Sequence, residues 1–552
     1  MPTFLSIRHL LGYSCLFLGW MIPDHIPPWN TFPQEATATL GIFLLWSWRG
    51  FKKFPIRIYA AAAIFAGAIA AQYIALGLEL GDLIFGILAA LIFCIAATIG
   101  QNTEFSGQHA QLWCYVLLAA ALGNTVIGLA QWLHVTQGLW MLDSPNGRVY
   151  GNFAQPNHFA TLLTLGIGSL IYLDTQKTLK GAWAHTAAFI LVVGLAASES
   201  RTGALSFTIM VAVVAYFGKG KDIAITLRWL IPALILFWIL YAFWGTISIF
   251  LGTSATRTGA GIDSSSRFEL WMQMLEAIRL HPWIGYGWLH IGAAQNAVAD
   301  YLGGTVNMDH AHNFFIDLLI WFGIPAAAIA FFAFVVWIFQ IIKNVQLKTK
   351  SSDSLLLLLM ITPIVIHSQL EYPFAYIYFL IVFSYFAGAI ETSLGYARIY
   401  SNKMKLTTNC FVFSGIIACL ILTQDYLRIE SDFRALRLES QFFTTKEQLH
   451  VFNPAPKLLT QYGTLIDVLR RDSSAPSISK SVDSAKSVVL RFPWLMTYQH
   501  YYVLLIKVQR CNDARKEKAV IKSLFGRFGI LKLEEEIQRQ QLAQSCEITE
   551  TD

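Results

Sequence analysis

The sequence has 552 residues, of which 55% are hydrophobic and only 13% are charged. A water-soluble domain carries charge on about a quarter of its residues, so this composition excludes an ordinary soluble protein and indicates a chain embedded in lipid. The net charge of +6 is small for this length, and no run of Lys and Arg has the clustering that nucleic-acid binding requires. We therefore expect no nucleic-acid partner.

Apolar runs separated by short polar breaks recur along most of the chain. A membrane-spanning helix needs about 20 mostly apolar residues, and the sequence contains thirteen runs of this type, of which the second, sixth and eighth are short. They lie near residues 9–26, 37–50, 58–78, 83–100, 112–132, 158–173, 184–199, 203–217, 226–250, 312–342, 354–370, 373–393 and 407–423. The predicted fold class is all-α, a polytopic membrane helical bundle of about 11–14 transmembrane helices.

The distribution of Lys and Arg between these runs predicts which side each connection faces, because short cytoplasmic loops retain positive charge. With the N-terminus inside, the opposite-side connections before residue 252 contain only Arg148 and Arg201. One predicted cytoplasmic loop, around residues 101–109, also lacks Lys and Arg. The segments expected outside are 133–157, the turn at Ser200, 252–311 and everything after residue 423.

The C-terminal tail differs from the rest of the chain in composition. Residues 424–552 hold 35 of the 74 charged residues, so we expect a water-exposed domain there. The chain would then divide into a transmembrane domain, 1–423, with a large external loop at 252–311, and a C-terminal helical domain, 424–552. Apolar spacing at 494–507 and 519–537 is helical, and Tyr498, Tyr501 and Tyr502 share a helix face. We interpret that stripe as packing between helices, with a docking surface for a protein partner as the alternative.

Cysteine usage gives little information. Five cysteines lie in apolar runs, where a thiol usually acts as a small hydrophobe: Cys15, Cys94, Cys114, Cys410 and Cys419. Only Cys511 and Cys546 fall in a polar region, and whether they form a disulfide stays open.

The long external loop ends in Asp309-His310-Ala311-His312-Asn313 and leads directly into an apolar run. A histidine facing water at the mouth of a span can act as a general base or pair with an anion. A histidine with a purely structural role is the alternative. His310 and His312 are two positions apart and would point to different faces of a helix, so we expect no shared metal ion.

Three arginines are expected at the outer edge of the bilayer, where a guanidinium is costly unless it meets an anion. Arg201 lies in a break between two predicted spans, Arg267 begins a segment that ends at Trp271, and Arg148 lies in a glycine-rich connection. For Arg201, an internal pair with Glu199 is the alternative. Guanidinium groups suit phosphate because they donate two parallel hydrogen bonds. Arginines beside a histidine therefore suggest a pyrophosphate-bearing substrate and proton abstraction.

Neutral amides and one carboxylate complete the set of external polar groups. Gln155 and Asn157 stand at the start of a predicted span and are suited to hydroxyl-rich sugars, although Pro156 between them is also ordinary for a helix start. Glu371 is a further external carboxylate, which would position an acceptor hydroxyl or cap a helix.

In order along the chain, these segments resemble the bacterial pilin-glycosylating (PglL-like) O-oligosaccharyltransferases, which are relatives of O-antigen ligases and O-antigen polymerases. His312-Asn313, nine residues and then Gly323 are similar to the ligase-family signature, whose histidine is considered catalytic. The segment from Gly151 to His158 is similar to one typical of the protein-glycosylating branch. The remaining similarity lies in Ser200 to Gly203, Arg267 to Trp271, Pro282, Gly285 to Gly287, and the tail.

The resemblance implies a metal-independent glycosyltransferase of the bacterial inner membrane with its active site facing the periplasm. It would move a preassembled glycan en bloc from undecaprenyl pyrophosphate to a Ser or Thr of a periplasm-exposed protein, commonly a type IV pilin. No cofactor is implied. His312 would be the catalytic base, and the donor-binding residues would be Arg201, Arg267 and Arg148. Substrate and acceptor positioning would fall to Gln155, Asn157, His310, Asn313 and Glu371.

Three other functions compete with this expectation. The nearest is an O-antigen ligase or polymerase, which uses a sugar acceptor, although the segment 155–158 and the long tail argue against it. A transporter would place polar residues at the bilayer midplane and show internal repeats. A membrane scaffold without chemistry would tolerate loss of His312, Arg201 and Arg267 together.

Overall fold

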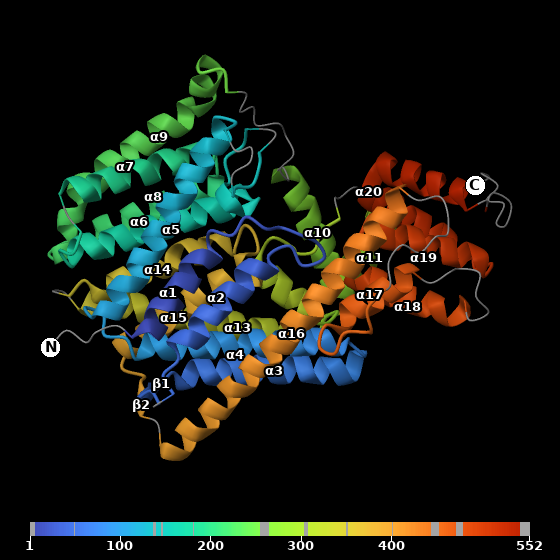
Figure 1. Cartoon of the computed structure of the whole chain (residues 1–552), viewed down its shortest axis with the longest axis horizontal. Helices are drawn as coiled ribbons and strands as arrows, with labels where there is room; N and C mark the ends of the chain where they lie inside the picture. The colour runs from blue at the N-terminus through green and yellow to red at the C-terminus, as the bar shows by residue number, and fades with distance from the viewer. Residues whose placement is uncertain are drawn as a thin grey trace. The chain divides into compact units, whose positions relative to one another are not determined.

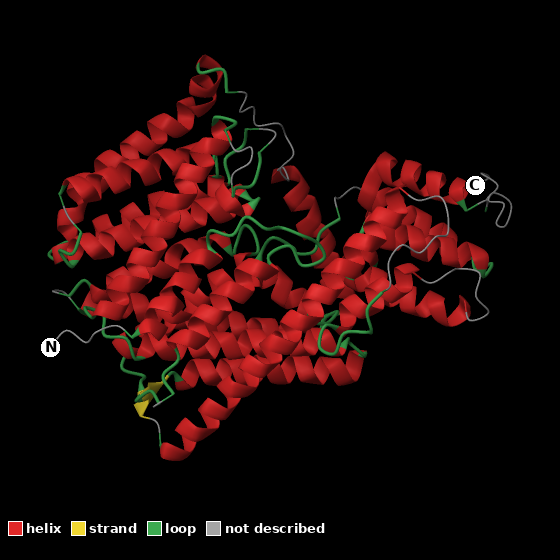
Figure 2. Ribbon diagram, in the orientation of Figure 1, coloured by secondary structure: helices red, strands yellow, loops and turns green. Residues whose placement is uncertain are grey.

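The computed structural model describes residues 6–48, 50–135, 140–144, 147–179, 181–253, 264–302, 307–348, 351–399, 401–442, 452–470, 478–540 and 542, and these are largely helical (Figure 2). Contacts divide the chain into two compact units. The first unit comprises Met1–Phe65, Ile87–Ala260 and Ala333–Cys419, and the second comprises Ala66–Gly86, Gly261–Phe332 and Leu420–Asp552. The predicted boundary after residue 423 lies within one long helix, and the predicted domain division stays a prediction.

Helices make up most of the described chain, as Figure 1 shows. Helices within the first unit are α1 (Ile7–Gly19), α2 (Phe32–Leu45), α5 (Gln108–Trp132), α6 (Pro156–Thr175), α7 (Ala182–Ala197), α8 (Arg201–Phe217), α9 (Leu227–Phe250), α14 (Asp353–His367) and α15 (Ile377–Ser393). Those within the second are α10 (Ser264–Leu280), α11 (Ile291–Asn296), α12 (Ala299–Leu302), α17 (Thr460–Arg470), α18 (Ile478–Arg491), α19 (Leu495–Lys507) and α20 (Cys511–Arg539). Residues of both units occur in α3 (Ile56–Leu76), α4 (Leu80–Gln101), α13 (Phe314–Leu347) and α16 (Asn402–Phe442).

Other regular elements in the first unit are short. Three 3₁₀ turns are η1 (Gly151–Phe153), η2 (Asp222–Thr226) and η3 (Pro373–Ala375). The strands β1 (Lys53–Phe54) and β2 (Arg398–Ile399) pair antiparallel. A two-residue ladder contributes little to the fold, so helix packing is what holds the unit together.

All thirteen predicted apolar runs lie on helices, α1 to α9 and α13 to α16, which confirms the predicted fold class. Among the described residues, six helices are long and apolar enough to cross a membrane: Ile56–Leu76, Leu80–Gln101, Gln108–Trp132, Asp222–Phe250, Phe314–Leu347 and Met404–Leu438. Shorter apolar helices are α7, α8, α14 and α15, whereas α1, α2 and α6 fall in neither group. The chain is a multi-pass membrane protein.

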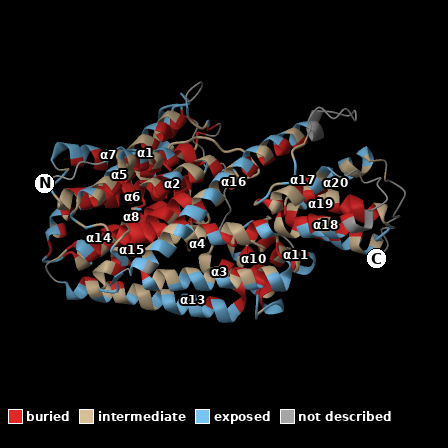
Figure 3. Cartoon of the chain, turned by 60° about the horizontal axis from the view of Figure 1, so that its bottom comes forward, coloured by how far each residue is buried: buried red, intermediate tan, exposed pale blue. Residues whose placement is uncertain are grey.

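Helix α6 is the central helix of the first unit. It packs against α5, α7, α8 and α14, and every residue from His158 to Leu173 is buried (Figure 3). Glycines allow the helices of this unit to approach closely, as is common in membranes. A Cβ added to Gly100 would lie 1.8 Å from the Tyr385 carbonyl oxygen, and one added to Gly388 would lie 1.9 Å from that of Ala97. Helices α4 and α15 therefore meet backbone to backbone.

In the second unit, the tail helices pack on one another and on the short helices α11 and α12. Helix α19 packs against α18 and α20, while α11 packs against α18 and α12 against α20. The side chains of Tyr498, Tyr501 and Tyr502 are buried, so the interpretation of the aromatic stripe as interhelical packing is confirmed. Cys511 is disulfide-bonded, whereas the predicted candidate partner, Cys546, lies outside the described residues.

A buried ion pair joins the tail to the start of α4 within the second unit. The Arg491 guanidinium donates from Nε and Nη2 to Asp82, at distances of 2.9 and 2.8 Å to Oδ1, and the Asp82 side chain is fully buried. Burial alone would lower the pKa of Arg491, but the Asp82 carboxylate raises it. Burial, and then the charge of Arg491, lowers the pKa of the nearby His290.

Candidate active site

In the first unit, the candidate segment around Gln155 forms the start of helix α6. The Gln155 side-chain oxygen accepts hydrogen bonds from the backbone N–H groups of Asn157, at 2.6 Å, and His158, at 3.3 Å. Pro156 occupies the first helical position, where its missing N–H costs nothing. Gln155 therefore acts as a helix cap, and its predicted contact with a sugar stays a prediction.

Asn157 connects three segments that are distant in the sequence. Its Nδ2 donates to Glu371 Oε1 at 3.1 Å, and its Oδ1 accepts from the Ser200 hydroxyl at 2.6 Å. Ser200 Oγ in turn accepts from the Gly203 N–H at 3.0 Å and so caps helix α8. The starts of α6 and α8 and the connection after α14 therefore share one buried polar cluster.

Arg201 is the first residue of α8, directly after the capping residue Ser200, and it is exposed. Within the described part of the chain its guanidinium forms no ion pair, so the alternative of a pair with Glu199 is wrong. An exposed guanidinium at a helix N-terminus favours an anion in two ways, because the helix dipole adds to its charge.

The connection that carries Arg148 is held by two buried amides of helix α5. Gln131 Oε1 accepts from the backbone N–H of Gly151 at 2.9 Å, and Asn124 Oδ1 accepts from that of Asn152 at 2.9 Å. Both amides were missed by sequence reasoning. The available signal was polar side chains inside an apolar run, which in a membrane helix usually have a specific partner. Arg148 itself is half-buried.

In the second unit, the histidine segment forms a tight turn before α13. His310 Nδ1 lies 2.9 Å from Asp317 Oδ2, and the other oxygen of Asp317 accepts the Ala311 N–H at 2.7 Å. The indole N–H of Trp271 donates to the Ala311 carbonyl at 2.9 Å. His312 follows with a φ of 56°, which a non-glycine residue rarely adopts. Sequence reasoning missed Asp317, a lone carboxylate in an apolar run.

The expectation that these histidines face water is wrong. His310 is 8% exposed and His312 is 5% exposed. Their burial accompanies two contacts to the turn, in which Asp317 accepts the Ala311 N–H and Trp271 donates to the Ala311 carbonyl.

Asn313 caps the helix that follows. Its Oδ1 accepts from the backbone N–H groups of Phe315, at 3.1 Å, and Ile316, at 3.2 Å. The side-chain oxygen is therefore used at the start of α13, and its predicted part in acceptor positioning stays a prediction.

The glycine of the signature marks a break in helix α13. Gly323 has a φ of 76°, outside the helical region. The groups freed by this break are bonded by the segment that precedes α11, because the Tyr286 N–H donates to the Ile320 carbonyl and the Ile324 N–H donates to the Pro282 carbonyl, both at 2.7 Å. The motif from Pro282 to Gly287 therefore supplies the hydrogen-bond partners that the broken helix lacks.

Gln72 of α3 supports the same break. Its Nε2 donates to the Trp321 carbonyl at 2.6 Å and to the Ile284 carbonyl at 3.1 Å, and its Oε1 accepts the Trp288 N–H at 3.0 Å. One buried amide in a candidate span thus satisfies backbone groups of both the broken helix and the loop.

Arg267 is half-buried on helix α10, four residues before Trp271. Residues four apart lie on the same side of a helix. The helix that carries Arg267 also binds the histidine turn, through the hydrogen bond from Trp271 to the Ala311 carbonyl. The nine predicted site residues fall into two groups. The first unit contains Arg148, Gln155, Asn157, Arg201 and Glu371, and the second contains Arg267, His310, His312 and Asn313.

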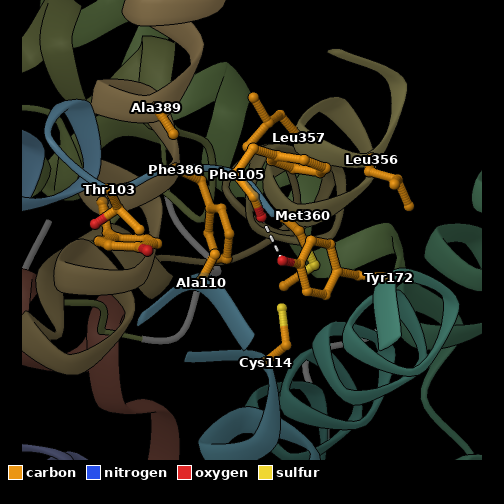
Figure 4. Close-up of a pocket in the computed structure, with 11 residues that line it drawn as sticks. Thr103, Phe105, Ala110, Cys114, Tyr172, Leu356, Leu357, Met360, Phe386 and Ala389 are labelled. Atoms are coloured by element: carbon orange, nitrogen blue, oxygen red, sulfur yellow. Dashed lines mark hydrogen bonds between the residues drawn. The ribbon is translucent and has the colours of Figure 1, made fainter. Parts of the chain in front are cut away.

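None of the predicted site residues lines the cavity described for this structure. Among the described residues no group of three or more His, Cys, Asp and Glu side chains is arranged to hold a metal ion, and the expected metal independence stays a prediction. Figure 4 shows a small cavity lined by residues that include Cys114 and Tyr172, whose hydroxyl donates to the Phe105 carbonyl. Tyr172 and Asn157 are fifteen residues apart on α6, which at 1.5 Å per residue is about 22 Å.

Comparison with known families accounts for these motifs. Residues 186–331, which contain Arg201, Arg267 and His312, match the family model described as "O-Antigen ligase". Residues 186–331 are therefore similar to an O-antigen ligase domain. A model described as "Protein glycosylation ligase" matches residues 149–173, where the capped start of α6 lies. A third, "Virulence factor membrane-bound polymerase, C-terminal", matches residues 355–528.

Two curated relatives are similar along nearly the whole chain. The general O-oligosaccharyltransferase of Acinetobacter baylyi is 26% identical over 539 residues, which is 93% of this chain and 92% of the relative. The ComP-specific O-oligosaccharyltransferase of the same organism is 26% identical over 531 residues, 92% of this chain and 93% of the relative. These matches confirm the resemblance expected from the sequence and support an enzyme of the oligosaccharyltransferase and ligase type.

Proposed function

We propose that this chain is a protein O-oligosaccharyltransferase of the bacterial inner membrane. It moves a preassembled glycan en bloc from undecaprenyl pyrophosphate to a Ser or Thr hydroxyl of a periplasmic protein such as a type IV pilin. The observation that carries the proposal is the similarity to two O-oligosaccharyltransferases over more than nine-tenths of the chain.

The donor is bound through its pyrophosphate by the guanidinium groups of Arg201, Arg267 and Arg148. A fixed cation placed where negative charge develops on the departing pyrophosphate stabilises the transition state more than the ground state. The exposure of Arg201 at a helix N-terminus supports this role. The lipid tail lies among the helices of the bilayer.

His312 takes the proton of the acceptor hydroxyl. The hydroxyl oxygen then forms a bond to the anomeric carbon, the bond from that carbon to the pyrophosphate oxygen breaks, and undecaprenyl pyrophosphate leaves with the electron pair. Substrate and acceptor positioning is assigned to the polar residues around the two helix starts, Gln155, Asn157, His310, Asn313 and Glu371. The reaction as written uses no metal ion and no cofactor.

The site faces the periplasm. In support, Lys and Arg are scarce in the connections on that side before residue 252. The disulfide at Cys511 points the same way, because disulfides persist in oxidising compartments such as the periplasm. A transmembrane domain of 1–423 with its loop at 252–311, and a C-terminal periplasmic domain of 424–552, remain part of this proposal.

Glycan transfer by the purified protein in lipid vesicles tests the proposal. The protein is supplied with undecaprenyl-pyrophosphate-linked oligosaccharide from glycan-producing bacteria and with a purified type IV pilin, and product is counted by intact mass. We expect His312→Ala to abolish the mass increase, since no base then takes the hydroxyl proton. His281→Ala, which alters an exposed histidine of the same loop, should leave it unchanged. Undiminished transfer by His312→Ala would show that the base is wrongly assigned.

A second candidate function is an O-antigen ligase or polymerase, which uses the same donor but a sugar acceptor. The match of residues 355–528 to a polymerase C-terminal model favours it. Pilin and lipopolysaccharide from cells with and without the gene separate the two functions. Loss of glycan from pilin supports the first, and loss from lipopolysaccharide alone supports the second.

A further inference from the structure

Asp317 is a fully buried carboxylate in the first turns of an apolar membrane helix. A buried carboxylate is costly unless hydrogen bonds and charge partners replace its water. The cap of α13 does not require it, because Asn313 already binds the first N–H groups of the helix. Both oxygens of Asp317 instead bind the turn that precedes the helix. The cost of its burial is therefore offset by contacts to the segment that carries the candidate base.

The two oxygens act on successive residues of that turn. Oδ2 is 2.9 Å from His310 Nδ1, and Oδ1 accepts the Ala311 N–H at 2.7 Å. Since Trp271 binds the Ala311 carbonyl, both polar groups of residue 311 are fixed. His312 is the next residue in the chain, and its backbone is in the left-handed region. The direction of its side chain therefore depends on the contacts that fix residue 311.

We infer that Asp317 is a positioning residue for the proposed transfer reaction and that it acts by holding the His310–Ala311 backbone so that the His312 imidazole is presented to the acceptor hydroxyl. This inference rests on the proposed function, because it needs His312 to be the base. Asp317 itself touches neither substrate nor reacting atoms. Trp271 binds the Ala311 carbonyl, which belongs to the next peptide group, with a single neutral hydrogen bond, so it makes a smaller contribution of the same kind.

The experiment measures kcat and the donor KM of the full-length protein in vesicles, with the lipid-linked oligosaccharide and pilin described above. Asp317→Ala removes both contacts, and a misplacement of about 1 Å in a catalytic group can cost about 100-fold in rate. We expect kcat to fall about 100-fold while the donor KM changes less than about threefold. Asp317→Asn keeps an oxygen for the Ala311 N–H and should restore kcat to within about tenfold of wild type.

Asp425 provides a matched control. Its carboxylate is also buried in the second unit and accepts two backbone N–H groups, those of Leu458 and Leu459. Asp425→Ala also removes two hydrogen bonds of a buried carboxylate, away from the histidine turn, and we expect kcat to stay within about twofold of wild type. A general loss of folded protein would lower the active fraction of both alanine variants alike.

The outcomes separate this inference from the proposed function. If wild type transfers glycan, His312→Ala does not, and Asp317→Ala keeps its kcat, the inference is overturned and the function stands. Equal losses in Asp317→Ala and Asp425→Ala, or a failure of Asp317→Asn to restore any rate, also overturn it. If wild type transfers nothing, the proposed function fails first.

Discussion

The start of α6 and the turn before α13 each hold candidate site residues at the end of an apolar helix, but they do so with different chemistry. Around Asn157 the contacts are made largely by amides and a hydroxyl, with Glu371 as the one carboxylate. Around His310 the contacts converge on the carboxylate of Asp317. The Asn157–Glu371 contact joins residues 214 positions apart, whereas the His310–Asp317 contact joins residues only seven apart.

This difference sets how each region responds to damage. A neutral hydrogen bond contributes only about 0.5–1.5 kcal/mol, so a shared cluster loses stability gradually. A buried ionised group left without its partner costs about 3–5 kcal/mol, so a single substitution in a charge-based contact removes a large part of the stability. The comparison teaches that the cluster of the first unit tolerates single losses better than the ionic contacts of the second.

The largest expected effect comes from breaking the ion pair between Arg491 and Asp82. Arg491→Ala leaves a buried carboxylate unpaired and should lower the free energy of unfolding by about 3–5 kcal/mol, measured by denaturant titration of the detergent-solubilised protein. The double variant Asp82→Leu with Arg491→Met removes both charges and should recover most of the loss. Arg279→Ala, which breaks a pair exposed at its arginine, should change nothing measurable. A small effect of Arg491→Ala would remove the contrast between charged and neutral contacts.

A smaller effect is expected from the cluster around Asn157. Asn157→Leu removes two hydrogen bonds and should cost about 1–3 kcal/mol of unfolding free energy, with a clear drop in glycan transfer because the starts of α6 and α8 are no longer joined. Asn344 is the control, since its amide bonds Ser354 and Ser393 in the same unit without any predicted site residue. Asn344→Leu should lose similar stability and keep its transfer rate. Equal transfer by both variants would argue against a functional role for Asn157.

The smallest effect on stability is expected at Arg201. Arg201→Gln alters an exposed side chain, so the unfolding free energy should change by less than about 0.5 kcal/mol. The donor KM should nevertheless rise about tenfold or more, because a charge-assisted hydrogen bond to phosphate is lost. Lys219→Gln changes an exposed cation beyond the other end of α8 and should leave KM unchanged. A donor KM unaffected by Arg201→Gln would remove this arginine from the donor site.

Much of the fold could be predicted because membrane helices appear in the sequence as long apolar runs. All thirteen runs lie on helices, although their edges moved. The run near 312–342 is a helix over Phe314–Leu347, and the run near 158–173 starts at Pro156. The helices α10 to α12 were not predicted, because their apolar residues are spread over short elements that a period of 3.6 does not single out.

The sequence predicted the site as a set of residue types on one side of the membrane. It did not predict which of these residues contact one another. No periodicity connects Asn157 with Glu371 across 214 positions. Asp317 was readable in principle, since a single carboxylate in an apolar run is rarely without purpose. Whether Gln155 and Asn313 cap helices or bind substrate depends on backbone geometry that residue types alone do not supply.

The break of α13 at Gly323 has a consequence for the spacing in the ligase signature. The loop forms hydrogen bonds to the helix around this glycine, while the histidine turn directly precedes the first residue of the helix. Inserting one residue between the two would rotate that end by about 100° and advance it by about 1.5 Å. The change in length is small, but the imidazole would point in a different direction around the helix axis. The nine-residue interval therefore constrains the direction of the histidine more than its distance from the glycine.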